Sequence, residues 1–332
     1  MTAPIAPSTG AANASVLGIG AYRPRRVVTN AEILEHIDSS DEWIQTRSGI
    51  KERRWAEPDE TVLMMATESA KEALAQSGVD AAQIGCVIVA TVTHLYQTPA
   101  IATRVAVEVG APTAAAFDIS AACAGFCYGI AMANDMVRGG SASYVLVIGV
   151  ERLSDITDRT DRSTAFIFAD GAGAAVVGPS DQPGIGPVVW GSDGTQHGLI
   201  SQKESWQEAA GSYNWPHLQM DGNPVFRWAS FEMAKVAQQA LDVAGVTVED
   251  LDVFVPHQAN MRITDAMRRA LKLPDHVKIA RDIERQGNTS AASIPLAIAA
   301  MRESGEARSG DLALIIGFGA GLVFAAQVIT LP

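Results

Sequence analysis

The sequence has few cysteines, no long hydrophobic run and no segment typical of a secretion signal. Three of its 332 residues are cysteines, Cys86, Cys123 and Cys127. This is too few for a disulfide framework and favours a reducing compartment such as the cytoplasm. No apolar stretch reaches the roughly 18 residues of a membrane-spanning helix, so we expect no membrane association. The start, MTAPIAPSTGAANAS, lacks a basic segment and an apolar run, and we interpret residues 1–14 as a flexible leader.

Basic residues are outnumbered by acidic ones. Lys and Arg number 25 against 37 Asp and Glu, which gives a net charge of −12. Nucleic-acid binding needs a basic surface, so the composition argues against it. An anionic ligand must therefore meet a local basic patch. The candidates are Arg47, Lys51, Arg53 and Arg54, and later Arg262, Arg268 and Arg269. For any one of these charges, a solvated helix face is the simpler interpretation.

Apolar residues are abundant, at 48% of the chain against 19% charged, so a large core is expected. A length of 332 residues predicts two domains or a duplicated unit. Short β-branched runs predict strands covered by helices on both faces, in an α/β fold. These runs are CVIVATV, YVLVIGV, GAAVVG, VFVP and LALIIGF. Helices are expected over 61–76, 126–137, 231–244 and 294–302, with stop signals at Gly78, Gly139, Gly245 and Gly305.

The chain repeats itself at a nearly constant offset. ALAQSGVDAAQIGCVIVATVTH matches ALDVAGVTVEDLDVFVPHQAN, with Gly78 aligned to Gly245 (245 − 78 = 167). The segments SAACAGFCYGIAMANDMVRGG and NTSAASIPLAIAAMRESG also correspond, and Gly149 aligns with Gly317 (317 − 149 = 168). A duplicated βα unit explains these blocks. We therefore expect an N-terminal half over 15–182, a loop-rich connection over 183–223 and a C-terminal half over 224–332.

Cys123 is the candidate nucleophile. The repeat places it at the start of a helix after the strand AAFDIS, where backbone N–H groups and the helix dipole stabilise a thiolate. The small residues around it permit a sharp turn between strand and helix. Cys127 lies one turn into the helix, and we interpret it as a packing residue. A Cys-x3-Cys metal site is the alternative, but no nearby His or Cys completes it, so we expect no metal.

His257 and Asn288 occupy matching places in the second half. VPHQANMRI places His257 just past a strand, and GNTSAASIP places Asn288 before the helix that corresponds to the Cys123 helix. Singly, such residues are more often structural. If a pseudo-twofold axis relates the halves, the three side chains converge. Cysteine, histidine and asparagine together indicate a thioester enzyme.

The expected roles follow from thioester chemistry. The thiolate takes the acyl group, while the His and Asn side chains donate hydrogen bonds to an enolate as it forms. The backbone N–H groups of Cys123 and of Ala320, in GFGAG, are the candidate oxyanion hole.

The chain resembles the β-ketoacyl-acyl carrier protein synthase III family, over nearly its whole length after the leader. The motifs are SSDEWIQTRSGI, AACAGF, DRSTAFIFADGAGAAVVG, VPHQANMRI and GNTSAAS. The resemblance implies a thiolase-like fold with a duplicated five-layer αβαβα architecture. It also implies a homodimer without cofactor or metal, and a catalytic triad of Cys123, His257 and Asn288. FADGAGAAVVG suggests a nucleotide loop, but it lacks the spacing and the lysine of one, so we interpret it as structural.

The resemblance also implies substrate contacts. Trp43 and Arg162 match the pair that sandwiches the adenine of coenzyme A, with Arg47 near its phosphates; a partly buried core aromatic is the simpler reading of Trp43. Thr98 stands where some members carry Phe and where the dimer partner helps close the acyl pocket, of which Phe168 is another implied member. The smaller side chain predicts tolerance of branched or longer starters. The implied surface for acyl carrier protein comprises Gln258, Ala259, Asn260, Met261, Arg262 and Arg269.

The implied reaction is the decarboxylative condensation of an acyl-coenzyme A starter with malonyl-acyl carrier protein, which initiates fatty acid synthesis. Alternatives are priming of a polyketide pathway and acyl transfer to a hydroxyl or amine. A thiolase would need a second catalytic cysteine, and an elongating ketosynthase a second histidine where Asn288 stands. A non-catalytic subunit would lack the nucleophile that Cys123 retains.

Overall fold

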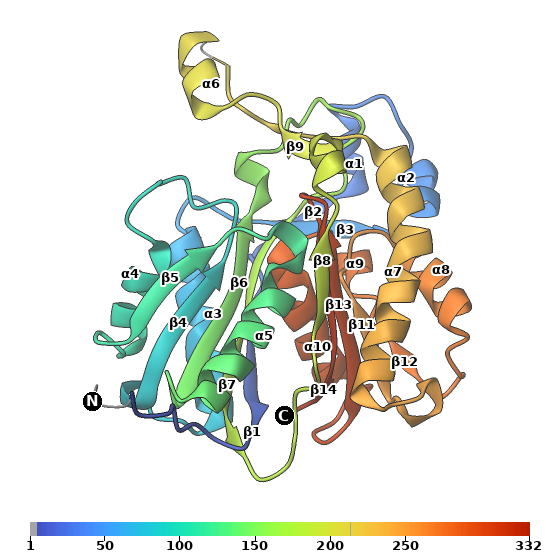
Figure 1. The fold of residues 1–332 in the computed structure, drawn as a ribbon. Coiled ribbons are helices and arrows are strands. Elements are labelled where there is room, and N and C mark those ends of the chain that lie inside the picture. The colour runs from blue at the N-terminus through green and yellow to red at the C-terminus, as the bar shows by residue number, and fades with distance from the viewer. Residues whose placement is uncertain (1–4, 213) are drawn as a thin grey trace.

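Two five-stranded sheets with the same strand order form the centre of the protein (Figure 1). The computed structural model describes residues 5–212 and 214–332. The first sheet runs β1 (Asn13–Tyr22), β7 (Asp170–Ser180), β6 (Tyr144–Arg152), β4 (Ile84–Ala90) and β5 (Ala115–Ile119). The second runs β8 (Val189–Ser192), β14 (Val323–Thr330), β13 (Leu312–Gly319), β11 (Val253–Pro256) and β12 (Lys278–Ile279).

The pairing directions also repeat. In the first sheet β4 is parallel to β5 and β6, whereas β7 is antiparallel to β6 and β1. In the second, β11 is parallel to β12 and β13, and β14 is antiparallel to β13 and β8. The predicted duplicated α/β fold is confirmed.

Helices cover both faces of each sheet and give five layers. The outer layer of the first sheet is α3 (Val62–Ser77) with α4 (Ile101–Val109), and that of the second is α7 (Gly222–Ala244) with α8 (Met261–Leu271). Between the sheets lie α5 (Gly125–Gly139) and α10 (Ser293–Ser304). Alternation along β6 explains the layering, because Leu146 and Ile148 face the outer helices while Val145 and Val147 face the inner core. The predicted αβαβα architecture is therefore present.

A smaller cap joins the two halves at the end of the sheets where α2 lies. It contains β2 (Arg26–Thr29), β3 (Glu52–Trp55), α1 (Asn30–Leu34), α2 (Asp41–Ser48) and α9 (Ile283–Gln286). A separate hydrophobic cluster holds the cap, with Ile44, Trp55 and Phe166 among its members. No helix in the described ranges combines the length and the apolar character needed to cross a membrane.

Helix boundaries differ from the predicted ones in two places. The helix that begins near Cys123 ends at Gly140, which adopts φ 78°, and Gly139 is its last helical residue rather than its stop. Backbone conformation decides which of two adjacent glycines ends a helix, and the pattern of side chains does not record it. Helix α7 begins at Gly222, earlier than the predicted residue 231. The prediction missed this start because the first turns of the helix have little apolar periodicity.

The leader and the connection both contribute strands. β1 begins at Asn13, within the predicted leader, and the Ala11 amide donates to the Val137 carbonyl. Within 183–223, β8 pairs with β14 in the second sheet, and β9 (Ile200–Gln202) pairs with β10 (Leu218–Met220) around α6 (Trp206–Ser212), which projects from the body (Figure 1). Residues 1–4 of the leader and residue 213 of the connection lie outside the described residues. The boundaries between the four segments stay predictions.

Candidate active site

Cys123 lies in a tight turn between β5 and α5. A single 3-10 turn, Ala122–Ala124, leads into α5 at Gly125, and Ala122 adopts φ 43°, a left-handed conformation that is rare outside glycine. Gly319, at the end of β13, makes room for the thiol, because a Cβ there would lie 2.8 Å from Cys123 Sγ. The turn therefore presents the sulfur to the space between the two halves.

The Cys123 thiol does not have the lowered pKa that its place at a helix start suggested. Burial raises the pKa of Cys123 to about 12, and the negative charge of Glu151 acts in the same direction. The hydroxyl of Ser290 lowers the pKa of the thiol, but by less. Desolvation disfavours the charged form of a thiol, and it is the largest cause of this shift. Cys123 itself is only partly buried and lines two cavities.

Cys127 is a packing residue. It is fully buried in the core between the sheets, and burial raises its pKa to about 12. Its carbonyl accepts a hydrogen bond from Gln327 Nε2 at 3.3 Å.

His257 follows β11 directly and is held as a neutral ring. Its backbone amide donates to the Ile316 carbonyl at 2.7 Å. Nδ1 lies 2.7 Å from Ser293 Oγ, and Phe318 packs edge-to-face with the ring at 5.4 Å. Burial lowers the pKa of His257 to about 3. Nε2 is therefore the ring nitrogen left to act on a ligand, and it belongs to an uncharged imidazole.

Asn288 lies in the loop between α9 and the 3-10 turn Ser290–Ala292. Its backbone bridges to the strand-like segment around Phe168, since its amide donates to the Ile167 carbonyl at 2.9 Å. The side-chain Oδ1 accepts from the Ser290 amide at 2.8 Å. This bond fixes the orientation of the amide and directs its NH2 group away from the turn. Asn288 therefore presents a hydrogen-bond donor.

The structure brings the three candidate catalytic residues together. Cys123, His257 and Asn288 line one cavity of about 600 Å³. Trp43 and Arg47 from α2 line its other end, as do Phe226 from α7 and Arg262 from α8. Both halves and the cap thus contribute to one site, which extends from the sulfur to a basic edge.

A second cavity, of about 920 Å³, also reaches Cys123. Cys123, Phe168, Ser290 and Ala320 line it. Ala320 follows β13 and lines the same cavity as Cys123, the residue beside which it was predicted to lie. Thr98 is exposed and does not line either cavity within this chain.

The residues predicted to hold adenine already touch one another. The Arg162 guanidinium lies 4.9 Å from the centre of the Trp43 ring, and that of Arg47 lies 5.9 Å from it. Trp43 also packs edge-to-face against Phe166 at 5.4 Å. Trp43 is therefore both a partly buried cap residue and one wall of the cavity.

The six predicted docking residues divide into exposed and buried ones. Arg262 and Arg269 are exposed on α8, and Arg262 lies over the Phe226 ring at 4.6 Å. The Asn260 side chain caps α8 and donates to the Arg47 carbonyl at 2.9 Å, while Ala259 lines the cavity. The side chains of Gln258 and Met261 are buried, at 2% and 7% exposure, so they face the interior.

Sequence reasoning missed four residues at this site. They are Phe226, Ser293, Ser290 and Glu151, which no local pattern marks as chemical. Ser290 and Ser293 belong to the quoted GNTSAAS motif, and their spacing after Asn288 was the available signal.

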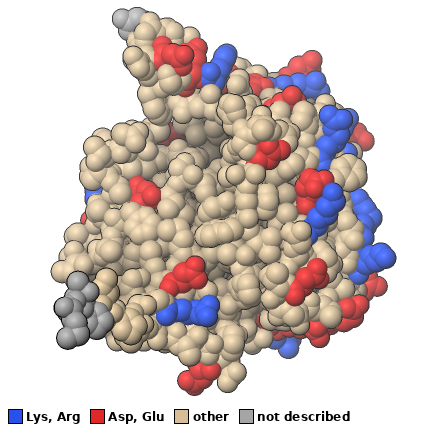
Figure 2. Space-filling model, in the orientation of Figure 1, with Lys and Arg blue, Asp and Glu red and all other residues tan. Residues whose placement is uncertain are grey.

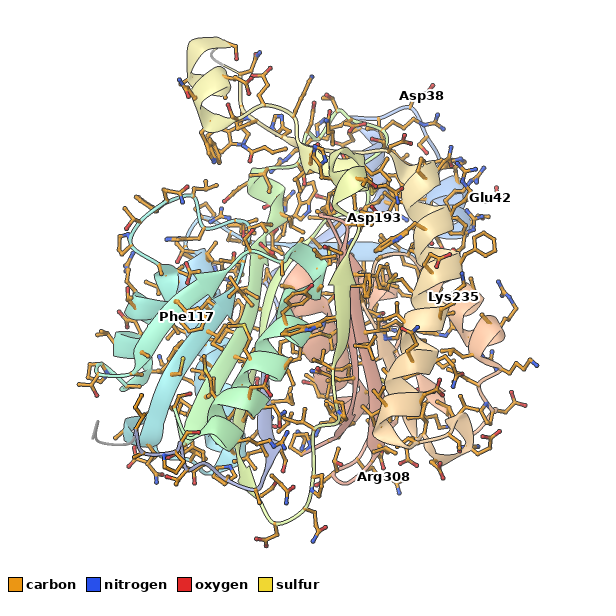
Figure 3. The ribbon with its side chains drawn as sticks, in the orientation of Figure 1. Asp38, Glu42, Phe117, Asp193, Lys235 and Arg308 are labelled. Atoms are coloured by element: carbon orange, nitrogen blue, oxygen red, sulfur yellow. The ribbon has the colours of Figure 1, made fainter. Side chains whose placement is uncertain are left out.

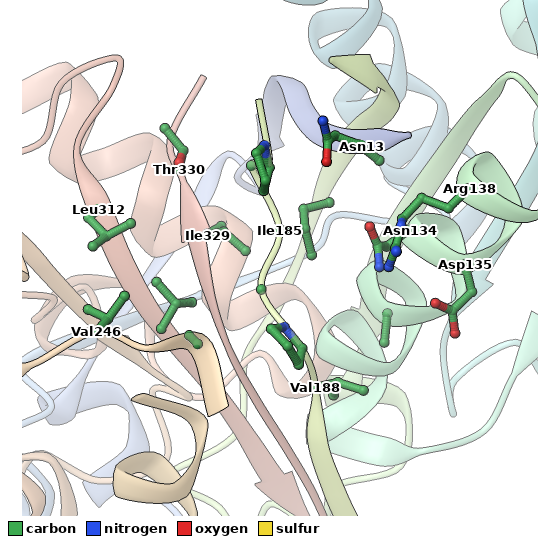
Figure 4. A pocket seen from close by; sticks show the side chains of 18 residues that line it. Asn13, Asn134, Asp135, Arg138, Ile185, Val188, Val246, Leu312, Ile329 and Thr330 are labelled. Atoms are coloured by element: carbon green, nitrogen blue, oxygen red, sulfur yellow. The ribbon is translucent and has the colours of Figure 1, made fainter. Parts of the chain in front are cut away.

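Neither a metal cluster nor the cavity at the other end of α5 competes with this site in the described part of the chain. Among residues 5–212 and 214–332, no group of three or more His, Cys, Asp or Glu side chains is placed to hold a metal ion. A cavity of about 590 Å³ at the other end of α5 is lined by Asn134, Asp135, Arg138 and Ile329 (Figure 4). It contains none of the predicted site residues.

A cysteine at a helix start, facing a histidine and an asparagine from an equivalent half, defines an acyltransferase of the thiolase fold. Known proteins agree. The chain matches the family 3-oxoacyl-[acyl-carrier-protein (ACP)] synthase III over residues 117–194 and the C-terminal part of the same family over residues 241–331.

Full-length relatives are more specific. The chain is 60% identical to beta-ketoacyl-[acyl-carrier-protein] synthase III 1 of Streptomyces coelicolor, with 99% of each chain covered. A solved priming beta-ketosynthase from the R1128 polyketide biosynthetic pathway is 50% identical, with a TM-score of 0.97 and 99% of each chain covered. The 3-oxoacyl-[acyl-carrier-protein] synthase III of Aquifex aeolicus is 38% identical, with a TM-score of 0.89 over 96% of this chain and all of that one. This chain belongs to the 3-oxoacyl-[acyl-carrier-protein] synthase III family.

Proposed function

We propose that the protein condenses an acyl-coenzyme A starter with malonyl-acyl carrier protein, releasing CO2 and coenzyme A, and so initiates fatty acid synthesis. The observation that carries the proposal is the meeting of Cys123, His257 and Asn288 in one cavity of a chain from this family. Acyl-coenzyme A and malonyl-acyl carrier protein are substrates, and the proposed reaction needs no cofactor.

The first half-reaction transfers the acyl group to Cys123. The sulfur attacks the thioester carbonyl, and the carbonyl oxygen becomes negative in the tetrahedral intermediate. The backbone N–H groups of Cys123 and Ala320 are the proposed donors to that oxygen. Collapse of the intermediate breaks the bond to coenzyme A and leaves the acyl-enzyme.

The second half-reaction decarboxylates the malonyl group. Its thioester oxygen accepts hydrogen bonds from His257 Nε2 and the Asn288 amide, which stabilise the enolate as CO2 departs. Donation by Nε2 requires a proton there and a free lone pair on Nδ1, so the Ser293 hydroxyl donates to Nδ1. The lowered pKa of His257 keeps this ring uncharged. The enolate carbon then attacks the acyl carbonyl on Cys123 and forms the new carbon–carbon bond. The bond between that carbonyl carbon and Cys123 Sγ breaks, so the cysteine sulfur is the leaving group and the β-ketoacyl product leaves on the carrier protein.

Coenzyme A enters beside α2 in this proposal. Trp43 and Arg162 stack on the adenine from opposite sides, and Arg47 attracts the phosphates. Because Arg162 already lies against Trp43, it moves away from the ring to admit the base. The acyl group then reaches Cys123 through the cavity that Trp43 and Arg47 share with His257.

Acyl carrier protein docks, in this proposal, at the exposed part of α8. Arg262 stands at the cavity edge, and Arg269 lies two turns further along the helix. Most of the Lys and Arg side chains visible in this view lie along the edge of the molecule that carries α2 and α8, where Asp and Glu side chains lie among them (Figure 2). Local positive charge explains how a protein of net charge −12 attracts an acidic partner. Gln258 and Met261 are not included, because they are buried.

Charge reversal tests the docking surface. Arg269→Glu should raise KM for malonyl-acyl carrier protein while acyl loading from coenzyme A is unchanged. Arg308→Glu, which lies outside α8 and at the end of the molecule away from α2, is the matched control (Figure 3). An equal rise in KM for both variants would remove α8 from the proposal.

We also propose a cytoplasmic homodimer that forms through β5. This strand is the edge of the first sheet, and its residues are half exposed although both faces of the sheet are covered. Phe117 marks this edge in Figure 3, and Leu95 and Tyr96 nearby are exposed at 41% and 71%. An open edge with apolar neighbours favours pairing with a second copy. Thr98 of each chain would then face the partner's acyl cavity.

The starter group separates fatty acid from polyketide priming. The 50% identity to a priming beta-ketosynthase of a polyketide pathway makes polyketide priming the alternative function. The expectation drawn from Thr98 is tolerance of branched or longer starters. Comparing the turnover of acetyl-, isobutyryl- and longer acyl-coenzyme A tests it. Strict preference for acetyl-coenzyme A would contradict that expectation.

Two measurements test the proposed reaction itself. Mass spectrometry after incubation with acyl-coenzyme A should show an acyl adduct that is lost in Cys123→Ala. Addition of malonyl-acyl carrier protein should then release CO2. An adduct without CO2 release would indicate acyl transfer to a hydroxyl or amine instead.

A further inference from the structure

Arg53 is a fully buried arginine in the cap that the reaction proposed above does not use. It stands on β3 and has no exposed surface, so it does not belong to a basic patch that meets an anionic ligand. Its guanidinium donates to the Val28 carbonyl at 3.0 Å, to Asn30 Oδ1 at 2.6 Å and to the Phe166 carbonyl at 3.0 Å. Burial lowers the pKa of Arg53 to about 10, so its charge persists at neutral pH. A buried charge that donates to neutral oxygens is costly to keep, so the groups that it holds matter.

Trp55, two residues further along β3, holds the same segment as Arg53. Side chains alternate in direction along a strand, so the two residues lie on one face of β3, which is buried. Trp55 Nε1 donates to the Phe168 carbonyl at 3.2 Å. β3 therefore binds the carbonyls of Phe166 and Phe168, and the carbonyl between them belongs to Ile167.

The Ile167 carbonyl accepts the hydrogen bond that holds Asn288. The backbone amide of Asn288 donates to it at 2.9 Å, and the Asn288 carbonyl accepts from the Ala169 amide at 2.9 Å. Both peptide groups of Asn288 are thus bonded to residues 167–169. Because Asn288 lies outside the two five-stranded sheets, its backbone position depends on this short bridge.

Close packing joins Arg53 to the loop that carries Asn288. Gly287, at the start of this loop, adopts φ 73°, and a Cβ there would lie 2.8 Å from Arg53 Cβ. The preceding helix α9 also packs against β3 (Figure 1), and the Lys51 amide beside β3 donates to the Glu284 carbonyl at 2.8 Å. The loop is therefore held by β3 through packing as well as through hydrogen bonds.

We propose that Arg53 and Trp55 are positioning residues for Asn288. By holding the carbonyls on either side of Ile167, they fix the carbonyl to which the Asn288 backbone is bonded. They thereby set where the Asn288 side-chain amide meets the malonyl thioester oxygen. The inference rests on the proposed function, because it concerns stabilisation of the enolate during decarboxylation.

Cys123 and His257 are held by other parts of the fold. Cys123 lies in the turn between β5 and α5, and the backbone amide of His257 donates to the Ile316 carbonyl in the second sheet. The His257 ring is held by Ser293 Oγ at 2.7 Å. Loss of a hydrogen bond from β3 should therefore displace the Asn288 donor while the nucleophile and the histidine stay in place.

The test measures CO2 release from malonyl-acyl carrier protein by protein that is already acylated on Cys123. Trp55→Phe removes the Nε1 donor but keeps a buried aromatic ring. We expect CO2 release to slow by about tenfold, less than the roughly 10²- to 10³-fold expected when an oxyanion donor is itself lost. The yield of acylated Cys123, measured by mass spectrometry, should be unchanged. Trp215→Phe is the matched control, because it removes the same atom from a hydrogen bond to the Asp155 carbonyl and should keep the wild-type rate.

Combining Trp55→Phe with the donor variants distinguishes positioning from a general structural effect. If Trp55 acts through Asn288, Trp55→Phe should slow CO2 release little further in an Asn288→Ala background, whereas it should still slow it in a His257→Ala background. Equal effects in the two backgrounds would overturn the proposal, as would a wild-type rate for Trp55→Phe alone.

Arg53→Met provides an independent variant, since it keeps an unbranched side chain and removes the donors to the Phe166 carbonyl. It should slow CO2 release with the same dependence on Asn288. Arg54→Met, on the other face of β3, is its matched control. A wild-type rate for folded Arg53→Met would contradict the proposal; if this variant does not fold, Trp55→Phe decides. A wild-type acyl-enzyme that releases no CO2 would instead refute the proposed function.

Discussion

Replacing His257 or Asn288 should separate the two half-reactions. Both side chains donate to the malonyl thioester oxygen, and neither is needed to carry the acyl group. His257→Ala removes Nε2, and Asn288→Ala removes the amide that the Ser290 backbone orients at 2.8 Å. We therefore expect each variant to load acyl groups on Cys123 but to fail in decarboxylation.

The expected magnitude follows from the loss of one donor to a developing oxyanion. Such losses cost about 10²- to 10³-fold in kcat, or roughly 2.7–4 kcal/mol of barrier. The double variant should lose less than the product of the two effects, because both donors act on one oxygen. Since His257 has a pKa of about 3, the decarboxylation rate of the wild-type protein should not titrate near pH 6.5.

CO2 release from malonyl-acyl carrier protein and mass spectrometry of the Cys123 adduct measure the two steps in the same samples. His276→Ala and Asn134→Ala are matched controls, because one histidine is on the surface and the asparagine lines the separate cavity of Figure 4. Loss of loading in both active-site variants would refute the division of labour.

Substitutions at three positions give direct tests. Gly319→Ala should block acyl loading, because a Cβ there would lie 2.8 Å from Cys123 Sγ; an unchanged adduct yield would contradict the described turn. Ser293→Ala should slow CO2 release by about fivefold, because His257 Nδ1 loses a hydrogen bond worth about 1 kcal/mol, and Ser293→Thr should restore much of the rate. Between pH 6.5 and about 3 the unfolded His257 binds a proton that the buried ring excludes. Stability should therefore fall as pH decreases through this window, and urea unfolding of His257→Asn should show a smaller decrease.

Local sequence was sufficient for the duplication and for the three candidate catalytic residues. Strand ends, glycine stops and small-residue turns are short-range features, so the offsets of 167 and 168 could be measured without coordinates. Its position at a helix start distinguished Cys123 from Cys127. Cys127 was interpreted as a packing residue, and it is fully buried in the core.

It was harder to predict which residues are exposed and which segments join a sheet. β8 joins the second sheet through β14, but its four residues lie in a segment whose composition is typical of a loop. Gln258 and Met261 stand in a motif with Arg262, yet they point inward because the start of α8 packs against the cap. Sequence neighbours within one motif can face opposite environments, and only packing decides which do.

The sequence by itself determined the α/β architecture, its repeat and the identity of the nucleophile, because these depend on residues close together in the chain. Only the tertiary structure decided the surroundings of that nucleophile. The pKa of Cys123 depends on burial between two layers and on Glu151 and Ser290, which are remote in sequence. Desolvation and charge act through space, so the chemistry of AACAGF is completed by residues that the motif does not contain.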